Sequence, residues 1–518
     1  MESGGPLPCS ANPRDGRGGW RASLFIIVVG FVERIGFIGV EGNLITYLSG
    51  PLGMSTAAAA AGANAWSGTV LVLPLVGALA ADSRLGRYRA VLLAGVLYLL
   101  SLGMLTVSSM LQTSQSHHRS CHGAATACSS APSPAWLAFF YAALYLLALA
   151  QGFHKPCSEA MGADQFDATA RASRSSYFNW FHFSISWGYA IAATAVTYVQ
   201  ENIGWTVGFA ACWAVMLVYL AVFLLGTRTY RAEQPVDGSS LARLTEEFTF
   251  SQKVVATDTD TQRLLVAEPE EGTEGFLARL LPIWLSSLVF AAAMAQVTTL
   301  FTKQGSTMDR RIGGLVVPPA ALQSFISITY ITLVPVYDRA LVPLVRRLTG
   351  HPAGITTLQR IGAGMAMSCV AMAAAALVEA KRLSTAKNAG LLDRPDVALP
   401  MSLWWLVPQY VLVGLAEVFT CIGLEEFFYD QVPDALRSVG LALCSSNILG
   451  VGNYASSALV AAIDWVTTRG GGESWFSDNL NRAHLDYFYW LLSGLGVLEV
   501  VVFLYFAKRY VYRNKCEQ

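Results

Sequence analysis

The sequence has few charged residues and no excess of either sign. Only 14% of its 518 residues are Asp, Glu, Lys or Arg, and 35 basic residues balance 35 acidic ones. A typical soluble domain has about 25% charged residues. Because the chain also lacks a basic block, it has no electrostatic footprint for nucleic acid, and we expect no nucleic-acid partner.

The sequence also lacks the short motifs that mark common enzymes. It contains no phosphate-binding glycine loop, no signature of a catalytic triad and no His or Cys spacing typical of a metal site. We therefore expect a protein that is not an enzyme and that uses no metal or cofactor. Cysteines are scattered, and only Cys121 and Cys128 share a polar loop, where a disulfide or two free thiols would both fit.

Apolar sequence is abundant, at 54% of all residues. A helix needs roughly 20 mostly apolar residues to cross a bilayer, and such stretches recur along the chain. We predict an all-α membrane protein with about twelve spanning helices, so the lipid bilayer is an expected partner. Six predicted helices lie near residues 23–47, 64–82, 89–111, 134–155, 177–200 and 205–226. Six more lie near residues 276–302, 319–345, 354–379, 402–429, 437–464 and 485–512.

A polar stretch, residues 227–275, separates the two sets of predicted helices. Its composition cannot bury enough apolar surface to fold alone, so we predict a linker. The predicted organisation is therefore an N-terminal six-helix bundle (1–226), a cytoplasmic linker (227–275) and a C-terminal six-helix bundle (276–518). Matching charged turns after the second and eighth helices favour two related halves.

Basic residues beside helix ends predict the orientation of the chain. In the first half they occupy alternate loops: Arg14, Arg17, Arg21, Arg84, Arg87, Arg89, Arg171 and Arg174. In the second half Lys381, Arg382, Lys387 and Arg394 fall in a predicted outer loop, so the contrast is weaker there. From the first half we expect both termini on the cytoplasmic side, in either the plasma membrane or the vacuolar membrane.

Charged residues inside the apolar stretches are the strongest functional signal. The first predicted helix carries Glu33, Arg34 and Glu41, the fourth carries Lys155, and the tenth carries Glu417 in mid-span. Such groups are costly in a membrane unless they are paired or hydrated, so they mark a transport pathway by default. The alternative is structural pairing that only holds helices together.

Lys155 and Glu417 lie in different halves, so an ion pair between them would report which way a central cavity faces. A carboxylate near a cation in a poorly hydrated site is suited to loading and releasing a proton. We predict that Glu33, Arg34, Lys155 and Glu417 take part in proton coupling or gating, with the proton as the coupling ion.

Several longer strings resemble one plant transporter family. They are GADQFD (162–167), YFNWFHF (177–183), PVYD (335–338), TTLQRIGAG (356–364), WLVPQY (405–410), EEFFYDQ (425–431), SWFSDNLN and HLDYFYWLL (474–492). In this order they resemble the nitrate transporter/peptide transporter family, the plant branch of the proton-coupled oligopeptide transporters. The resemblance implies a major facilitator fold, with two pseudo-symmetric six-helix bundles around a central cavity. It also implies proton symport of a small solute, in a family whose substrates include peptides, nitrate, glucosides and plant hormones.

The resemblance assigns roles to the same charged residues. Lys155 in HKPC and Glu417 in GLAEVF match the family's helix-4 lysine and helix-10 glutamate. Glu33 and Arg34 match the end of its helix-1 Glu-x-x-Glu-Arg signature, which is linked to proton coupling. Gly30 stands where this signature has its first glutamate, so one proton-handling carboxylate is absent.

Other departures concern the expected substrate cavity. Phe37, Ile38 and Glu41 replace two tyrosines and a peptide-binding arginine of peptide-transporting relatives. Met294 replaces a histidine that a nitrate-transporting relative uses, Phe153 replaces a common glycine, and Gln296 lies beside Met294 in the same expected cavity. A carboxylate would meet Glu41 rather than an arginine, so we expect a neutral or weakly cationic, partly apolar organic solute.

Three functions stay open after this comparison. The first is a proton-coupled secondary transporter that binds a small solute and protons. The second is a facilitator or exchanger without net proton symport, which the missing glutamate allows. The third is a solute-sensing transceptor, because Ser83 occupies the place of a regulatory phosphorylated threonine in a relative, although a simple turn serine also fits. The sequence leaves the oligomeric state open.

Overall fold

The computed structural model describes residues 17–81, 85–120, 133–166, 171–231, 276–336, 347, 356–431, 437–469 and 473–510. The predictions for Ser83, for the Cys121–Cys128 pair and for most of the 227–275 linker therefore concern residues outside the described ranges.

Nearly all regular structure in the described ranges is helical. The N-terminal half contains α1 (Gly19–Glu41), α2 (Leu44–Ser49), α3 (Thr56–Ala80), α4 (Arg87–Ser120), α5 (Pro134–Ala163), α6 (Arg171–Ile191), η2 (Ala192–Val196), α7 (Thr197–Asn202) and α8 (Trp205–Gly226). The C-terminal half contains α10 (Phe276–Leu285), α11 (Leu288–Met294), α12 (Leu300–Ser306), η3 (Pro319–Gln323), α13 (Ser324–Val336), α15 (Thr357–Asn388), η5 (Leu403–Leu406), α16 (Val407–Gln431), α17 (Arg437–Thr468) and α18 (Leu485–Arg509).

Consecutive helices join end to end into twelve rods within the described ranges, as the sequence predicts. Among the described residues, seven helical stretches are long and apolar enough to cross a membrane, the first of them being α1 and α2 together. The rod made of α10, α11 and α12 is broken into short pieces instead. At its first break Ser286 and Ser287 donate their hydroxyls back to the carbonyl of Ile283. Side-chain hydrogen bonds of this kind compete with the helix ladder and favour breaks and bends.

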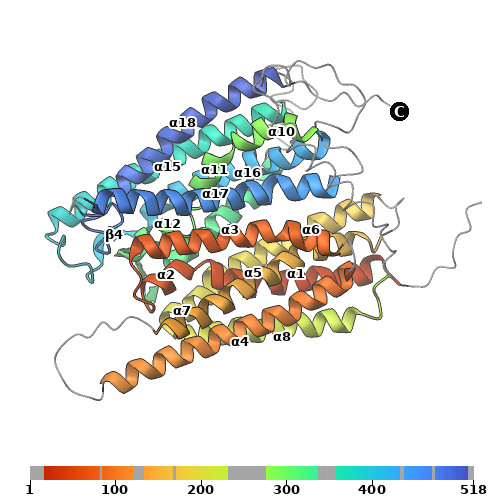
Figure 1. The fold of residues 1–518 in the computed structure, drawn as a ribbon, viewed down its shortest axis with the longest axis horizontal. Helices are drawn as coiled ribbons and strands as arrows, with labels where there is room; N and C mark the ends of the chain where they lie inside the picture. Colours follow the sequence, from red (N-terminus) through yellow and green to blue (C-terminus); the bar gives the residue numbers. More distant parts are fainter. Residues whose placement is uncertain are drawn as a thin grey trace, which may run out of the picture.

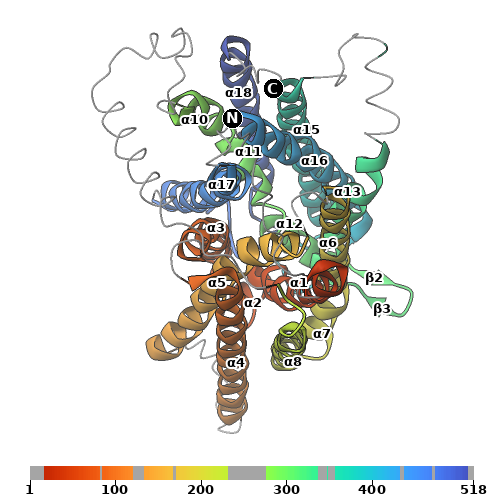
Figure 2. The same ribbon diagram turned by 90° about the vertical axis from the view of Figure 1, so that its right-hand side faces the viewer.

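The rods form two bundles that lie side by side (Figure 1). The N-terminal half forms the lower bundle in this view and the C-terminal half forms the upper one, with α3 packed against α17 between them. Figure 2 shows the same two groups of helices end-on. Large apolar side chains such as Leu225 and Leu377 are 72% and 61% exposed on the outside of the bundles. Exposure of this kind suits a surface that faces lipid.

Two short strand pairs mark one end of the molecule. Strand β1 (Met308–Asp309) pairs in parallel with β4 (Leu399–Ser402), and β2 (Arg311–Ile312) pairs antiparallel with β3 (Leu315–Val316). We call this end the strand end. The opposite end, where α1 begins and α18 ends, is the terminus end (Figure 1).

Helix α15 is longer than the sequence predicts. It was expected to end near residue 379, but it continues to Asn388, so Lys381, Arg382 and Lys387 lie on a helix rather than in a loop. The reason is that Arg382 pairs with Glu379 one turn earlier, and both side chains are fully buried. A buried ion pair whose two members bind each other does not end a helix, although charged residues of this kind are typical of a loop.

Candidate proton and solute pathway

A buried carboxylate lies at the centre of the N-terminal half. Glu33, on α1, is 1% exposed and accepts a hydrogen bond of 2.9 Å from the hydroxyl of Tyr98 on α4. Its carboxylate lies 3.7 Å from Nε2 of His154 on α5 and 3.8 Å from the guanidinium of Arg34. Three helices therefore bring ionisable side chains together around one carboxylate, away from solvent.

The cluster around Glu33 extends through neutral groups. Tyr98 also contacts the side-chain carbonyl of Gln151 on α5. Nδ1 of His154 lies 3.0 Å from the hydroxyl of Tyr219 on α8, and that hydroxyl donates to the carbonyl of Val91. A hydrogen bond at one ring nitrogen of a histidine sets which nitrogen carries the proton, so the Tyr219 hydroxyl constrains the tautomer of His154. The cluster thus joins the Glu33 carboxylate to polar groups on three other helices.

Sequence reasoning missed His154, Tyr98 and Gln151. His154 directly precedes Lys155 in an apolar helix, so the rule that intramembrane ionisable residues are functional should have included it. Tyr98 and Gln151 carry no charge, and nothing in their local sequence separates them from ordinary core residues.

Arg34, Glu41 and Lys155 form a second group next to the Glu33 cluster. Arg34 and Lys155 are the cations whose charge acts on Glu41. The charges that act most strongly on Lys155 are Arg34 and then Glu159, Glu425 and Glu41. Glu425 belongs to α16, so the charge environment of Lys155 already spans both halves.

Glu417, in the middle of α16, acts on aromatic hydroxyls of two other helices. These are the hydroxyls of Tyr189 on α6 and Tyr330 on α13. The predicted Lys155–Glu417 pair stays a prediction.

The position of the missing signature glutamate is filled by an aromatic ring. Gly30 is buried on α1, and a Cβ atom placed there would lie 2.9 Å from Cε2 of Phe181 on α6. Phe181 is itself 3% exposed. A longer side chain at residue 30 would therefore require this ring to move.

The residues proposed to line the substrate cavity have different environments. Phe37 and Ile38 are buried in the N-terminal core, where Phe37 stacks on Trp66 of α3 with 5.9 Å between ring centroids. Met294 is also buried, whereas Phe153 and Glu41 are only partly buried. Of this set, Glu41 and Phe153 retain accessible surface in the present conformation.

Gln296 takes part in a contact between the halves. Its side-chain amide donates 2.8 Å hydrogen bonds to the hydroxyl of Ser456 on α17 and to the carbonyl of Ala292. Asn64 on α3 donates to the same hydroxyl at 3.0 Å. Gln296, Ser456 and Asn64 are all buried, so this polar contact forms part of the closed interface between α3 and α17.

Further contacts between the halves gather toward the strand end. The amide of Gln323, on η3, donates to the carbonyl of Gly42 beyond α1, and its carbonyl oxygen accepts from Tyr189. Arg310, between β1 and β2, forms a 2.6 Å ion pair with Glu201 on α7. These contacts hold the two bundles together at the end where the strands lie.

Glu425 and Glu426 are adjacent acidic residues on α16, and both are exposed. Glu426 pairs with Arg360 of α15 at 3.3 Å. Across the described ranges, no three His, Cys, Asp or Glu side chains are grouped so that they could hold a metal ion.

Comparisons with known proteins agree over nearly the whole chain. The sequence profile of the POT family matches residues 88–269 and 275–476. Protein NRT1/ PTR FAMILY 5.10 of Arabidopsis thaliana is 46% identical, over 95% of this chain and 93% of the relative. Protein NRT1/ PTR FAMILY 5.16 of the same plant is 44% identical, over 96% of this chain and 94% of the relative.

Solved structures show the same fold. An auto-inhibited POT family peptide transporter superimposes with a TM-score of 0.72 at 20% identity, covering 96% of this chain and 99% of that chain. A POT family transporter in complex with 5-aminolevulinic acid superimposes with a TM-score of 0.67 at 15% identity, covering 96% of this chain and 98% of that chain.

Proposed function

The chain belongs to the POT family of membrane transporters, and from this premise we propose that it moves a small solute by proton-coupled secondary transport. The membership confirms the family, the helical membrane fold and the non-enzymatic character that the sequence predicts. Proton coupling in this chain, its solute and its membrane go beyond that membership and are proposed from the residues.

The observation that carries the proposal is the buried carboxylate of Glu33. A carboxylate that lies 1% exposed among Tyr98, His154 and Arg34 is costly to keep in a membrane protein unless it has a function. Because residue 30 is glycine, Glu33 is the acid of the helix-1 signature that this chain retains, and the ring of Phe181 packs beside Gly30. We propose that Glu33 binds and releases the coupled proton.

The transport step is proposed to be alternating access between the two bundles. In the present conformation, polar contacts such as Arg310–Glu201 and Gln323–Gly42 close the strand end. Opening of the strand end would break them, and we propose that the Lys155–Glu417 pair forms or breaks as the cavity changes the side it faces. Relative motion of two repeats around a central site is the usual behaviour of transporters built this way.

For the solute we propose a neutral or weakly cationic, partly apolar organic molecule. Glu41 keeps accessible surface where peptide-transporting relatives have an arginine, and Phe153 keeps accessible apolar surface. The positive charges of Arg34 and Lys155 partly offset the negative charge of Glu41. A solute that carries both a positive and a negative charge therefore also fits the proposal. The bound 5-aminolevulinic acid of one structural relative is a molecule of that second kind.

We also propose that both termini and the 227–275 linker face the cytoplasm, in the plasma or vacuolar membrane. The support is the arginine-rich turns at alternate ends of the first six rods. Tags placed in the linker and in the 121–132 loop should be accessible from opposite sides of the membrane. Accessibility from the same side would contradict the orientation.

The main test is solute uptake by cells that express the chain, screened over many compounds at several external pH values. We expect uptake that rises as the external pH falls, and Glu33→Gln should remove this pH dependence, because glutamine cannot take up a proton. Glu473→Gln, which changes an exposed carboxylate at the strand end, is the matched control and should behave like the unaltered protein.

Two other outcomes favour the alternative functions. Uptake that is independent of pH in the unaltered protein would favour a facilitator or exchanger. Solute-dependent signalling with negligible uptake would favour a transceptor, and Ser83→Ala would then be the first variant to examine.

A further inference from the structure

One contact at the strand end joins the two halves through a carboxylate and a helix start. Asp478 lies between α17 and α18, and its Oδ1 accepts a 2.7 Å hydrogen bond from the backbone N–H of Thr56. Thr56 is the first residue of α3, in the other half. The first N–H groups of a helix have no partner within it and carry partial positive charge. A carboxylate is therefore well suited to bind there.

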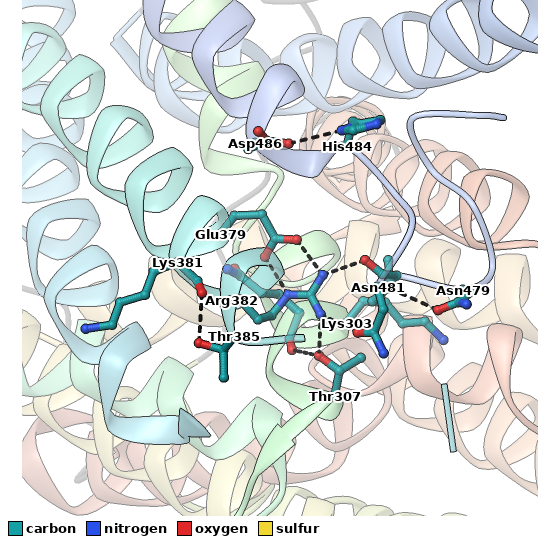
Figure 3. A network of polar contacts seen from close by, with 12 residues as sticks. Lys303, Thr307, Glu379, Lys381, Arg382, Thr385, Asn479, Asn481, His484 and Asp486 are labelled. Atoms are coloured by element: carbon teal, nitrogen blue, oxygen red, sulfur yellow. Dashed lines mark hydrogen bonds and ion pairs between the residues drawn. The ribbon is translucent and has the colours of Figure 1, made fainter. Parts of the chain in front are cut away.

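The segment that carries Asp478 is firmly attached to its own half. The guanidinium of Arg382 donates to the carbonyl of Leu480 at 2.6 Å and to Oδ1 of Asn481 at 2.9 Å (Figure 3). The side chain of Asn481 donates in turn to the carbonyl of Leu391. Because Arg382 is fully buried and bound to Glu379, these bonds hold the backbone next to Asp478 in a fixed position, within reach of α3.

Water can reach this contact from a small cavity. The cavity has a volume of about 130 Å³, and Lys303, Asp478 and Asn481 are among the residues that line it. Lys303, on α12, makes a second contact between the halves, since its ammonium donates to the hydroxyl of Ser49 at 2.8 Å. When the halves separate, both charged groups can be hydrated from this space, so the contact can break without leaving a buried charge unsatisfied.

We propose that Asp478 is a latch that holds α3 against the 473–484 segment while the strand end is closed, and that it releases before the strand end opens. The proposal rests on the alternating access proposed above. In this role Asp478 sets the equilibrium between the closed and the open strand end and does not contact the solute.

The test measures the distance between the halves directly. Spin labels on unnatural amino acids at Ala58 of α3 and Asn388 of α15, both exposed, leave the nine native cysteines in place. Pulsed electron resonance on the purified full chain, without solute, then gives the populations of closed and open strand ends. We expect Asp478→Ala to raise the open-to-closed ratio about tenfold, a change that corresponds to about 1.4 kcal/mol.

The same hydrogen bond can be removed from the opposite side. Thr56→Pro deletes the donor, and proline is well tolerated at the first position of a helix. Ser55, the preceding residue, has φ −57° and ψ 151°, a conformation that a residue before proline adopts readily. Thr56→Pro should therefore fold and should shift the ratio as Asp478→Ala does. The double variant should shift it no further, because both changes remove one bond.

Two control variants separate the latch from general damage. Thr56→Val keeps the backbone donor, and Asp393→Ala removes an exposed carboxylate that binds Arg482 within the C-terminal half. Neither should change the ratio. Two distance populations whose ratio is the same in Asp478→Ala, Thr56→Pro and the unaltered chain would overturn the latch alone. A single distance in every variant and at every pH would count against alternating access as well as against the latch.

Discussion

Replacing Arg382 by methionine should destabilise the protein strongly, and a second replacement should restore part of the loss. The guanidinium of Arg382 binds both carboxylate oxygens of Glu379, at 2.8 and 2.6 Å, and both side chains are fully buried. Removing one partner of a buried ion pair costs about 3–5 kcal/mol, because the other charge is stranded. The neutral acceptors on Leu480 and Asn481 also lose their donor, at about 1 kcal/mol each.

The single variant Arg382→Met should therefore lose about 5–7 kcal/mol, from about 3–5 for the stranded charge and about 2 for the two acceptors. The double variant Glu379→Leu/Arg382→Met carries no buried charge and should lose only the acceptor contribution, about 2 kcal/mol. The double variant should thus be more stable than the single one, which is the opposite of what additive damage would give.

The assay is thermal unfolding of the detergent-purified protein, followed by tryptophan fluorescence at one fixed heating rate, because unfolding of such a protein need not be reversible. Melting temperatures should fall in the order unaltered, double variant, single variant. Arg482→Met removes an exposed arginine from the same end and should leave the melting temperature unchanged. If the double variant melted below Arg382→Met, or if Arg382→Met melted like the unaltered protein, the buried pair would not have the role described.

Three further predictions concern the spanning helices. Lys155→Ala and Glu417→Ala should each abolish most uptake at normal surface abundance, and near-normal uptake in either variant would make the residue a structural one. Glu41→Gln should keep pH-driven uptake of the native solute and improve uptake of carboxylate-bearing analogues; a flattened pH dependence would instead assign Glu41 to coupling. Glu499→Leu should lower the melting temperature, since Glu499 accepts the N–H groups of the second and third residues of α11, Val289 and Phe290, at 2.7 and 3.0 Å, and stranding them costs about 1–3 kcal/mol each. Glu499→Gln keeps an acceptor and should be milder; equal melting of both variants would contradict this reasoning.

The helical membrane fold was predictable from the sequence, because a helix that crosses a membrane needs a long apolar stretch and such stretches can be recognised directly. The α10–α12 rod was placed correctly, but its breaks were not predicted, because they depend on contacts such as those of Ser286 and Ser287 with the helix backbone. The end of α15 was misplaced because Glu379 and Arg382 look like loop residues until their mutual burial is seen. Composition alone cannot tell a solvated charge from a buried pair.

The candidate site was only partly predictable for a related reason. Glu33 and Arg34 stood out because charges are rare in spanning helices, and the structure brings them together with His154 and Tyr98. The uncharged residues of this site could not be identified from the sequence, since a tyrosine in an apolar stretch is usually a core residue.

The glycine at residue 30 changes how the departure from the family signature should be understood. In the sequence, Gly30 replaces a glutamate of the family signature, and the loss of that carboxylate suggests that proton coupling is lost. In the structure, the ring of Phe181 packs where that side chain would begin, so the site has been closed rather than left empty. Glu33, one turn further along α1, is enclosed by Tyr98, His154 and Arg34. Because Glu33 has few solvent contacts, the stability of its charge depends mainly on its protein partners. Movement of the surrounding helices should therefore affect this charge more than it would affect an exposed one. The substitution is therefore consistent with coupling that runs through one acid instead of two.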